Sequence, residues 1–513
     1  MHHTLHAAGP GLQLNSWERR HPCLPQGSWP RSGRQDAYGP SPQLKSAQNK
    51  VNFQFMPESI LSTAVTEAVD ADEATSLACH TCGRLNNQRV LISELPPSVA
   101  ALMKADAGVT PDLAHVCANC FELFSRARAQ IDSHQVVFEQ TDYVLPTPLR
   151  LNADERFTGK GITIAFLDSG FYAHDDLTKP ENRIAAYHSI FDAENDSTSL
   201  KTTDVASWHG MMTSVVAAGN GHLSRGFYRG IAPDSQVVLV KIGRTGHIPD
   251  EQIGRGLEWV LANKKKYDIR IVNISAGGDR ELSYLDSPLC RIVEQAVAAG
   301  LIVVCAVGNA GMSPGHRVLP PASSPSAISV GGLDDQNSLD RARRGMYRSS
   351  YGPTIDGLQK PEIIAPGIWV AAPILPSTPT ADEAQLSSEL DKAADDELRA
   401  IISSHAGVDK DFDEARDLPL PLIRQLITIK LREGNVISPH YKYVDGTSFA
   451  SPIVASVAAC MLEANPKLTP QQVKRILIDT AERVPGIEVE RQGWGVVVPR
   501  KAVEVALATR VAE

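Results

Sequence analysis

Short apolar runs alternate with stretches of helical periodicity from about residue 151 onward. The runs are rich in β-branched residues and end in glycine or other small residues; they span 161–170, 235–243, 269–278, 301–311 and 326–332. Amphipathic stretches at 253–267 and 289–300 lie between them. Strands that are apolar on both faces and alternate with helices are typical of a parallel sheet covered on both sides. The pattern therefore predicts an α/β fold with a mainly parallel central sheet and helices on both faces.

Three segments break this alternation. Residues 1–55 are rich in Pro, Gly, Ser and Gln without periodicity, which is typical of disorder. Residues 56–150 are expected to form a small separate domain that carries two cysteine pairs. Residues 375–440 are acidic and helix-forming, and we interpret them as an insertion in a domain spanning 151–509. The insertion could overhang a functional cleft or stand in solvent, and the sequence leaves both interpretations open.

The composition fits a soluble globular protein of two or three units, because 42% of the 513 residues are hydrophobic and 21% are charged. The formal net charge of -9 argues against nucleic acid as a partner. No uninterrupted apolar run approaches the roughly 18 residues that span a membrane, so no membrane association is expected. The amino-terminal residues lack the basic and apolar regions of a secretory signal. We therefore expect a cytoplasmic location.

Four of the eight cysteines form two CxxC pairs, in LACHTCGRL (77–85) and HVCANCFELF (115–124). Two such pairs can surround Zn²⁺ with four thiolates. We predict a closed, structural zinc site in a zinc-ribbon or treble-clef-like domain, with the ligands Cys79, Cys82, Cys117 and Cys120. A disulfide or a redox CxxC is the alternative. Three other cysteines lie in apolar runs and are expected to be buried free thiols, as in a reducing compartment; they are Cys290, Cys305 and Cys460.

Four polar residues stand where a parallel sheet would present them, at the ends of strands or the starts of helices. Asp168 ends the first apolar run, and Asn309 ends the run LIVVCAVGN. His209 precedes small and apolar residues that predict a buried helix. Ser448 stands at the head of a second predicted buried helix, before the apolar run 453–461.

These four residue types suit nucleophilic catalysis. A serine hydroxyl is a poor nucleophile near neutral pH unless a base takes its proton and an acid orients that base. We predict that His209 is the base for Ser448 and that Asp168 holds the histidine Nδ1–H. The backbone N–H of Ser448 and the Asn309 carboxamide are the expected donors to the oxyanion that forms. A lone serine before a helix is usually a plain cap, so the prediction depends on the four residues together.

The sequences around these residues resemble the motifs of the subtilisin-like serine proteases, the subtilase family. AFLDSG resembles the family's aspartate motif, HGMMTSVVAAGNG its histidine motif, GTSFASPIVAS its serine motif and VGNAG its oxyanion asparagine segment. The chain order Asp, His, Ser is also that of subtilisin. The resemblance covers about 151–509 and implies the subtilisin-like three-layer fold and a serine endopeptidase. Met211 stands where the family commonly has threonine, which is expected to alter packing but not catalysis.

The resemblance also implies how substrate binds. NISAGG (273–278) resembles the family segment that borders the specificity pocket. An extended polypeptide substrate is therefore expected to pair with the backbone of Ser275, Ala276 and Gly277.

Other interpretations stay open. Family members often bind Ca²⁺, but the candidate carboxylates form no spaced ligand loop and are expected to be solvated surface acids; they are Asp175, Asp176 and Asp192. Residues 56–150 occupy the place of a subtilase prodomain without matching its pattern, so they could instead dock a protein partner. The chain could also be a zinc-ribbon adaptor with a catalytically degenerate protease domain, although the intact four-residue set argues against this.

Overall fold

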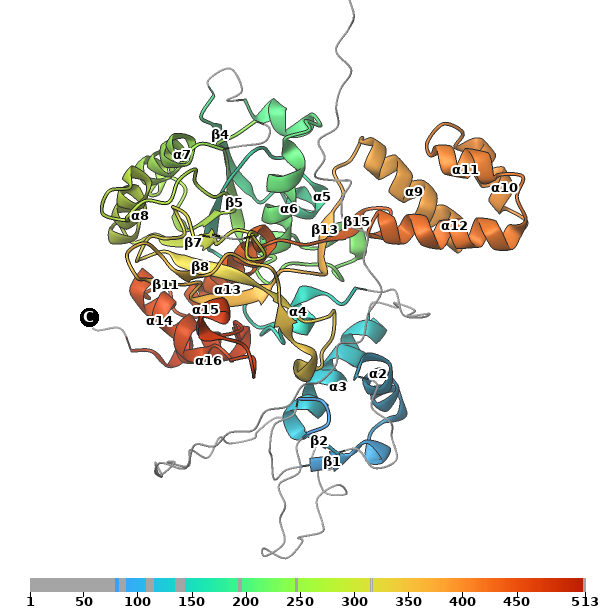
Figure 1. Cartoon of the computed structure of the whole chain (residues 1–513), viewed down its shortest axis with the longest axis horizontal. Coiled ribbons are helices and arrows are strands. Elements are labelled where there is room, and N and C mark those ends of the chain that lie inside the picture. Colours follow the sequence, from blue (N-terminus) through green and yellow to red (C-terminus); the bar gives the residue numbers. More distant parts are fainter. Residues whose placement is uncertain are drawn as a thin grey trace, which may run out of the picture. The chain divides into compact units, whose positions relative to one another are not determined.

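An eight-stranded sheet is the central element of this chain, shown as a computed structural model in Figure 1. The structure describes residues 79–82, 89–107, 115–133, 144–191, 196–244, 248–313, 315 and 317–510, so the disorder predicted for residues 1–55 lies outside it. The strand order is β12-β8-β7-β6-β3-β5-β4, all parallel, with β9 antiparallel to β8. The bounds are β3 Thr163–Asp168, β4 Ile184–Ser189, β5 Gln236–Lys241, β6 Ile269–Ile274, β7 Ile302–Ala306, β8 Ile328–Asp334, β9 Gly345–Met346 and β12 Ile363–Pro366.

The direction in which the sheet grows reverses at β3. After β3 the chain adds β4 and β5 on one side, and then β6, β7, β8 and β12 on the other. Open α/β sheets bind their ligands at such a reversal, beyond the carboxyl ends of the strands. Asp168 ends β3 and Ser275 follows β6, so both lie at this point.

Both faces of the sheet are buried because successive strand residues belong to different apolar clusters. In β3, Ile164 and Phe166 pack in one cluster with residues of α6 and α13, whereas Ala165 and Leu167 pack in another with residues of α7 and α8. The long helices of this domain are α6 Ser207–Ala218, α7 Asp250–Asn263, α8 Pro288–Ala298, α13 Thr447–Ala464, α14 Pro470–Thr480 and α16 Pro499–Ala508. The predicted α/β fold class is confirmed.

Helix α13, which carries Ser448, is deeply packed. By length and composition it could cross a membrane, but 83% of it is buried inside the protein. Its apolar face and its small residues instead fill the centre of one core cluster. The apolar pattern of the sequence thus marks a core helix whose first turn reaches the functional edge of the sheet.

Residues 375–440 contain four helices that share a core of their own: α9 Pro379–Lys392, α10 Leu398–Ser404, α11 Lys410–Ala415 and α12 Leu420–Glu433. That core consists of Leu386, Leu390, Leu398, Ile402, Phe412, Ile423 and Ile427. A small antiparallel sheet flanks them in the order β13-β15-β14, with bounds β13 Val370–Pro373, β14 Val436–Ser438 and β15 Tyr441–Val444. The segment is helical, as its composition predicts, and β15 leads directly to the start of α13.

The described residues between 79 and 133, here called the four-cysteine unit, contribute most of a further small core. Strand β1 (Arg89–Leu91) pairs antiparallel with β2 (His115–Cys117), and helices α2 (Pro97–Ala107) and α3 (Ala118–Ser133) complete the unit. The boundaries predicted for the domains stay a prediction. The remaining short elements are η1 Ile92–Glu94, α4 Thr147–Arg150, α5 Asp175–Thr178, η3 Ser197–Lys201, η4 His222–Ser224, η5 Arg341–Arg343, β10 Gly352–Pro353, β11 Gln359–Lys360 and α15 Val489–Gln492.

Candidate active site

The four predicted catalytic residues come from four elements. Asp168 is the last residue of β3, and Asn309 lies in the loop after β7. His209 lies in the first turn of α6, and Ser448 lies in the first turn of α13. Two parallel strands and two buried helices therefore position these side chains from rigid parts of the fold.

Asp168 and His209 form a hydrogen-bonded pair. The Nδ1 of His209 lies 2.8 Å from Oδ1 of Asp168, and this oxygen also accepts the backbone N–H of Ser169 at 2.8 Å. The other carboxylate oxygen accepts the hydroxyl of Thr213 at 3.2 Å. The Asp168 side chain is 2% exposed and that of His209 is 21% exposed. With its Nδ1–H on the carboxylate, the imidazole keeps Nε2 free to accept a proton.

The environment of His209 favours its protonated form. Burial alone would lower the pKa of His209, but the charge of Asp168 and the hydrogen bond to it outweigh burial and raise that pKa above its ordinary value. A raised pKa makes the neutral imidazole a stronger base.

Gly210 permits the close approach of α6 to β3. A Cβ at this position would lie 2.1 Å from the carbonyl oxygen of Gly170 and 2.9 Å from the Cβ of Asp168. Met211 comes next and is fully buried in the core beneath α6. Methionine in place of the family's threonine therefore affects core packing and leaves the Asp168–His209 hydrogen bond in place.

Ser448 lies in the first turn of α13, a helix that packs against α6, which carries His209. Its hydroxyl donates a long hydrogen bond of 3.5 Å to the carbonyl oxygen of Ser275, and no hydrogen bond joins it to His209 in the part of the chain that the structure describes. The ring of the next residue, Phe449, lies 5.8 Å from the His209 ring between centroids. Catalytic hydrogen bonds are often unformed or long without substrate.

Thr447 fixes the Asn309 carboxamide. The backbone N–H and the hydroxyl of Thr447 donate to Asn309 Oδ1 at 2.9 and 3.0 Å, and the same hydroxyl accepts the N–H of Gly308 at 3.2 Å. Because Oδ1 is occupied, Nδ2 is the end of the carboxamide that remains available as a donor. The sequence reasoning missed this residue, although a hydroxyl directly before Ser448 was a signal for it.

A small space lies between the two expected oxyanion donors. Gly446 has a φ of 140°, and a Cβ built on it would lie 3.7 Å from Ser448 N and 3.8 Å from Asn309 Nδ2. Both donors therefore flank one point that a glycine leaves empty. Stabilising an oxyanion requires donors that already surround one position in this way.

Ser275 ties the end of β6 to the start of α13. Pro452 lies inside α13 and has no N–H, so the carbonyl of Ser448 lacks its usual helical donor. The Ser275 hydroxyl donates to this carbonyl at 2.9 Å and accepts a hydrogen bond from Asn273 Nδ2 at 2.9 Å. Ser451 donates to the Asn273 side-chain oxygen at 2.7 Å. The side chain of Ser275 thus anchors the serine-bearing helix, a role that the sequence did not reveal.

The predicted substrate segment follows the end of β6. Ser275 is buried, Ala276 is half-buried and Gly277 is exposed. Within the described residues, the backbone groups of Ala276 and Gly277 make no backbone hydrogen bond, whereas Gly278 N–H donates to the Pro320 carbonyl at 2.7 Å. Unpaired backbone groups of this kind are what an added strand uses.

The carboxylates considered for Ca²⁺ are engaged in other contacts. Asp175 pairs with Lys179 at 3.0 Å. Asp176 is fully buried and accepts the hydroxyl of Tyr441 at 2.7 Å. The prediction of a solvated acid is wrong for Asp176, because Tyr441 of β15 covers it. Asp192 lies outside the described residues.

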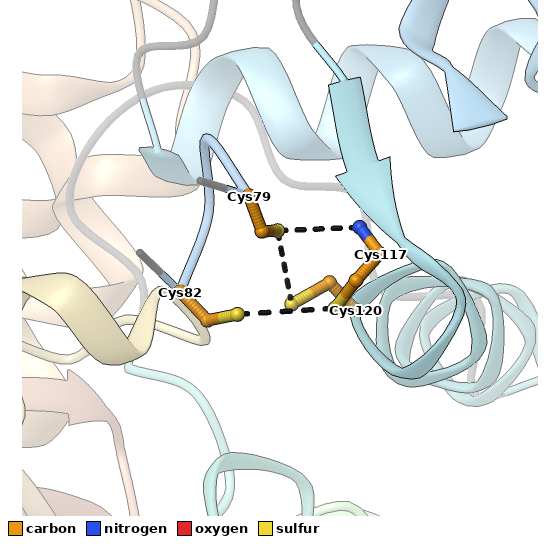
Figure 2. Close-up of side chains that lie close together, drawn as sticks. All are labelled: Cys79, Cys82, Cys117 and Cys120. Atoms are coloured by element: carbon orange, nitrogen blue, oxygen red, sulfur yellow. Dashed lines mark hydrogen bonds between the residues drawn. The ribbon is translucent and has the colours of Figure 1, made fainter. Parts of the chain in front are cut away.

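The four predicted zinc ligands converge (Figure 2). Their Sγ atoms lie within 4.8 Å of one another, with 3.8 Å between Cys79 and Cys120 and 3.8 Å between Cys82 and Cys117. Ligands about 2.3 Å from a tetrahedral Zn²⁺ stand roughly 3.8 Å apart, so the set fits this ion. None of the four forms a disulfide within the described residues, so the alternative of a disulfide has no support here.

The part of this chain that contains the four predicted catalytic residues is similar in sequence to known proteins. A model described as the subtilase family, peptidase S8, matches residues 159–495. Serine protease AprX of Bacillus subtilis (strain 168) is 30% identical over 358 residues, which cover 68% of this chain and 67% of AprX. Subtilisin of Bacillus pumilus is 27% identical over 216 residues, 42% of this chain and 67% of that protein. The solved CspB protease of Clostridium perfringens shares the fold at 15% identity, with a TM-score of 0.50, covering 72% of this chain and 97% of CspB.

Proposed function

The chain belongs to the subtilase family of serine proteases, and from this premise we propose that it is an endopeptidase with Ser448 as its nucleophile. The observation that carries the proposal is the 2.8 Å hydrogen bond between Asp168 and His209 beside the first turn of α13. As Ser448 Oγ attacks the scissile carbonyl, His209 Nε2 takes its proton and Asp168 stabilises the resulting imidazolium.

The oxyanion forms in the space beside Gly446. The backbone N–H of Ser448 and Nδ2 of Asn309 flank that space, and Thr447 keeps the carboxamide turned so that nitrogen faces it. His209 then passes its proton to the leaving amine, and the acyl group remains on Ser448. Water, deprotonated by the same histidine, hydrolyses this acyl-enzyme and restores the serine hydroxyl.

The substrate is an extended polypeptide that adds a strand along Ala276 and Gly277. Two observations on the described residues support this placement: these backbone groups are unpaired, and a Cβ at Gly277 would meet no atom within 4 Å beyond its chain neighbours. Ser275 contributes its carbonyl oxygen at the same edge while its hydroxyl holds α13. Backbone pairing would supply affinity, and side-chain pockets would supply selectivity.

The four-cysteine unit holds a structural Zn²⁺. Four thiolates leave no open position on a tetrahedral ion, so the metal would stabilise the fold of the unit and take no part in hydrolysis. The convergence of Cys79, Cys82, Cys117 and Cys120 supports this assignment. A docking role of the unit toward a protein partner stays a prediction.

The compartment is proposed to be reducing, as in the cytoplasm. None of the seven cysteines in the described ranges forms a disulfide, and the three outside the four-cysteine unit, Cys290, Cys305 and Cys460, are buried free thiols. Burial raises the pKa of Cys290, which keeps that thiol protonated and unreactive. Free thiols in this number are typical of a reducing environment.

Hydrolysis of a peptide by variants of the full chain tests the proposed function against a non-catalytic adaptor. Ser448→Ala is expected to lower kcat by about 10⁶-fold, the scale of loss of the serine in subtilisin. Ser456→Ala is the matched control, because Ser456 lies in the same helix and its hydroxyl donates to the Ile453 carbonyl. Equal activity of Ser448→Ala and the wild-type chain would refute the proposal.

A further inference from the structure

We propose that Arg150 is a positioning residue that links the four-cysteine unit to the backbone that places Ser448. This inference rests on the proposed role of Ser448 as nucleophile. It assigns a task to a buried arginine, at the end of α4, that touches none of the four catalytic residues.

The first link runs from the four-cysteine unit to the loop after β8. Leu339 is 2% exposed and packs in the same apolar core as the cysteine ligands. The carboxylate of Asp106, at the end of α2, accepts the Ser338 hydroxyl at 2.9 Å and the Leu339 N–H at 3.0 Å. The loop is therefore ordered by the unit whose core surrounds the metal site.

Arg150 holds this loop with one side of its guanidinium. Its Nη1 lies 2.5 Å from Asp335 Oδ1, and the two side chains are 0% and 4% exposed. With its other contacts Arg150 reaches the turn before β13, where Nη2 donates to the Trp369 carbonyl at 2.9 Å and Nη1 to that of Ile368 at 3.4 Å. These contacts compensate the burial of the charge at Nη1 and Nη2, while Nε has no hydrogen-bond partner among the described residues.

That turn contacts the cap of the serine-bearing helix. Gly367 N–H donates to the Leu333 carbonyl at 2.9 Å, and the Gly367 carbonyl accepts the N–H of Gly446 at 2.8 Å. Gly446 precedes α13 and borders the space between the oxyanion donors. Release of the turn would shift Gly446 and hence the N–H of Ser448, and a misplacement of about 1 Å near a reacting group can cost about 100-fold in rate.

Arg150→Met in the full, zinc-loaded chain tests the link. We expect kcat to fall by about 10- to 100-fold while KM changes by less than roughly twofold, since the substrate segment is untouched. Amide deuterium exchange should become faster in peptides that cover 366–371 and 444–449. Arg150→Lys should show a smaller loss of kcat. The lysine ammonium can still pair with the Asp335 carboxylate, but it lacks the planar fork with which arginine also reaches the carbonyls of Ile368 and Trp369.

Arg424→Met is the matched control. Arg424 pairs with Asp395 at 2.8 Å and donates to the carbonyls of Leu390 and Ala393 inside the insertion. It thus makes the same kinds of contact as Arg150 inside the insertion, although its side chain is 34% exposed. Its loss should leave kcat and the exchange of 444–449 unchanged.

Wild-type kcat and exchange in folded Arg150→Met would overturn the proposal. If that variant does not fold, Asp335→Asn replaces it. We expect this variant to lose less kcat, and wild-type kcat and exchange in it would overturn the link.

Removal of zinc from the wild-type chain with 1,10-phenanthroline should speed amide exchange at 333–339 and 366–371. Unchanged exchange would refute the connection to the four-cysteine unit. The proposed function fails separately, if wild-type Ser448 is not labelled by a fluorophosphonate.

Discussion

At the residue scale, Gly446 controls the space in which the oxyanion would form. A methyl group there would stand within 4 Å of Ser448 N and Asn309 Nδ2, at a φ that disfavours any side chain. We expect Gly446→Ala to lower kcat by about 100- to 1,000-fold, the loss seen when one oxyanion donor is removed. Steady-state peptide hydrolysis by the folded variant measures this.

Gly407→Ala separates backbone strain from loss of the donor space. Gly407 also has a positive φ, of 89°, but a Cβ there would meet nothing within 4 Å. Its substitution should leave kcat at the wild-type value. Equal losses in both variants would show that the effect is not specific to the space beside Gly446.

The pKa of His209 sets the acid limit of activity. The imidazole must be neutral to accept the Ser448 proton, so activity falls as the pH drops through this pKa. Because Asp168 raises it, half-maximal kcat/KM on the acid side should lie above about 6.5, the ordinary histidine value. A pH profile of kcat/KM reports this group in the free enzyme; a limb below the ordinary value would contradict the assigned interaction.

The sequence indicates where the proposed catalytic residues lie, but it does not indicate the residues that support them. Asp168 ends a strand, Asn309 lies in the loop just after one, and His209 and Ser448 lie in the first turns of helices. Local patterns reveal such positions. Thr447 and Ser275 act through partners far away in the chain, on Asn309 and on the Ser448 carbonyl. Local patterns carry no information on which distant group a hydroxyl will meet.

At the element scale, Tyr441 joins β15 and the insertion to α5. Its buried hydroxyl donates to the Asp176 carboxylate at 2.7 Å. Tyr441→Phe removes one donor from a fully buried charge, so we expect the free energy of unfolding to fall by about 1–3 kcal/mol. Denaturant unfolding measures the loss.

Tyr172→Phe is the control for that substitution. Tyr172 packs against the core, and no hydrogen bond of its hydroxyl is present in the described residues. Tyr172→Phe should therefore change the free energy of unfolding much less than Tyr441→Phe does. If the two variants lose the same amount, the hydrogen bond to Asp176 does not stabilise the junction.

The strands that sequence could reveal were those buried on both faces. β3, β5, β6 and β7 lie inside the predicted apolar runs, and β8 begins inside the run 326–332 and extends two residues beyond it. β4 escapes the pattern because it is an edge strand of mainly half-buried residues, including Tyr187 and His188. Its place is set by pairing with β5, a tertiary effect that overrides local composition.

At the scale of the whole molecule, the four-cysteine unit should carry one zinc ion per chain. Cys79→Ser and Cys117→Ser each remove a ligand, so metal content should fall and the unit should lose the binding energy that stabilises its fold. Elemental analysis by mass spectrometry checks this. Cys290→Ser, at a buried thiol outside the cluster, should keep its metal; equal zinc in all three variants would remove the assignment.

The contacts between the four-cysteine unit and the rest of the chain were the feature that the sequence predicted least. The CxxC spacing predicts a metal site, but nothing in it shows that Leu339 and Asp106 join the unit to the loop after β8. Likewise, Arg150 stands in no motif, and its importance follows only from its contacts with Asp335 and Trp369. Such contacts depend on the complete fold and not on local periodicity.

Covalent labelling of the intact chain with a fluorophosphonate, followed by peptide mapping, tests the central claim most directly. The reagent reacts with a serine that an adjacent histidine activates. The arrangement of Asp168, His209 and Asn309 predicts one adduct, on the peptide that contains Ser448, and none in the Ser448→Ala variant. A folded wild-type chain without an adduct, or an adduct that persists in Ser448→Ala, would contradict the assignment of Ser448 as the nucleophile.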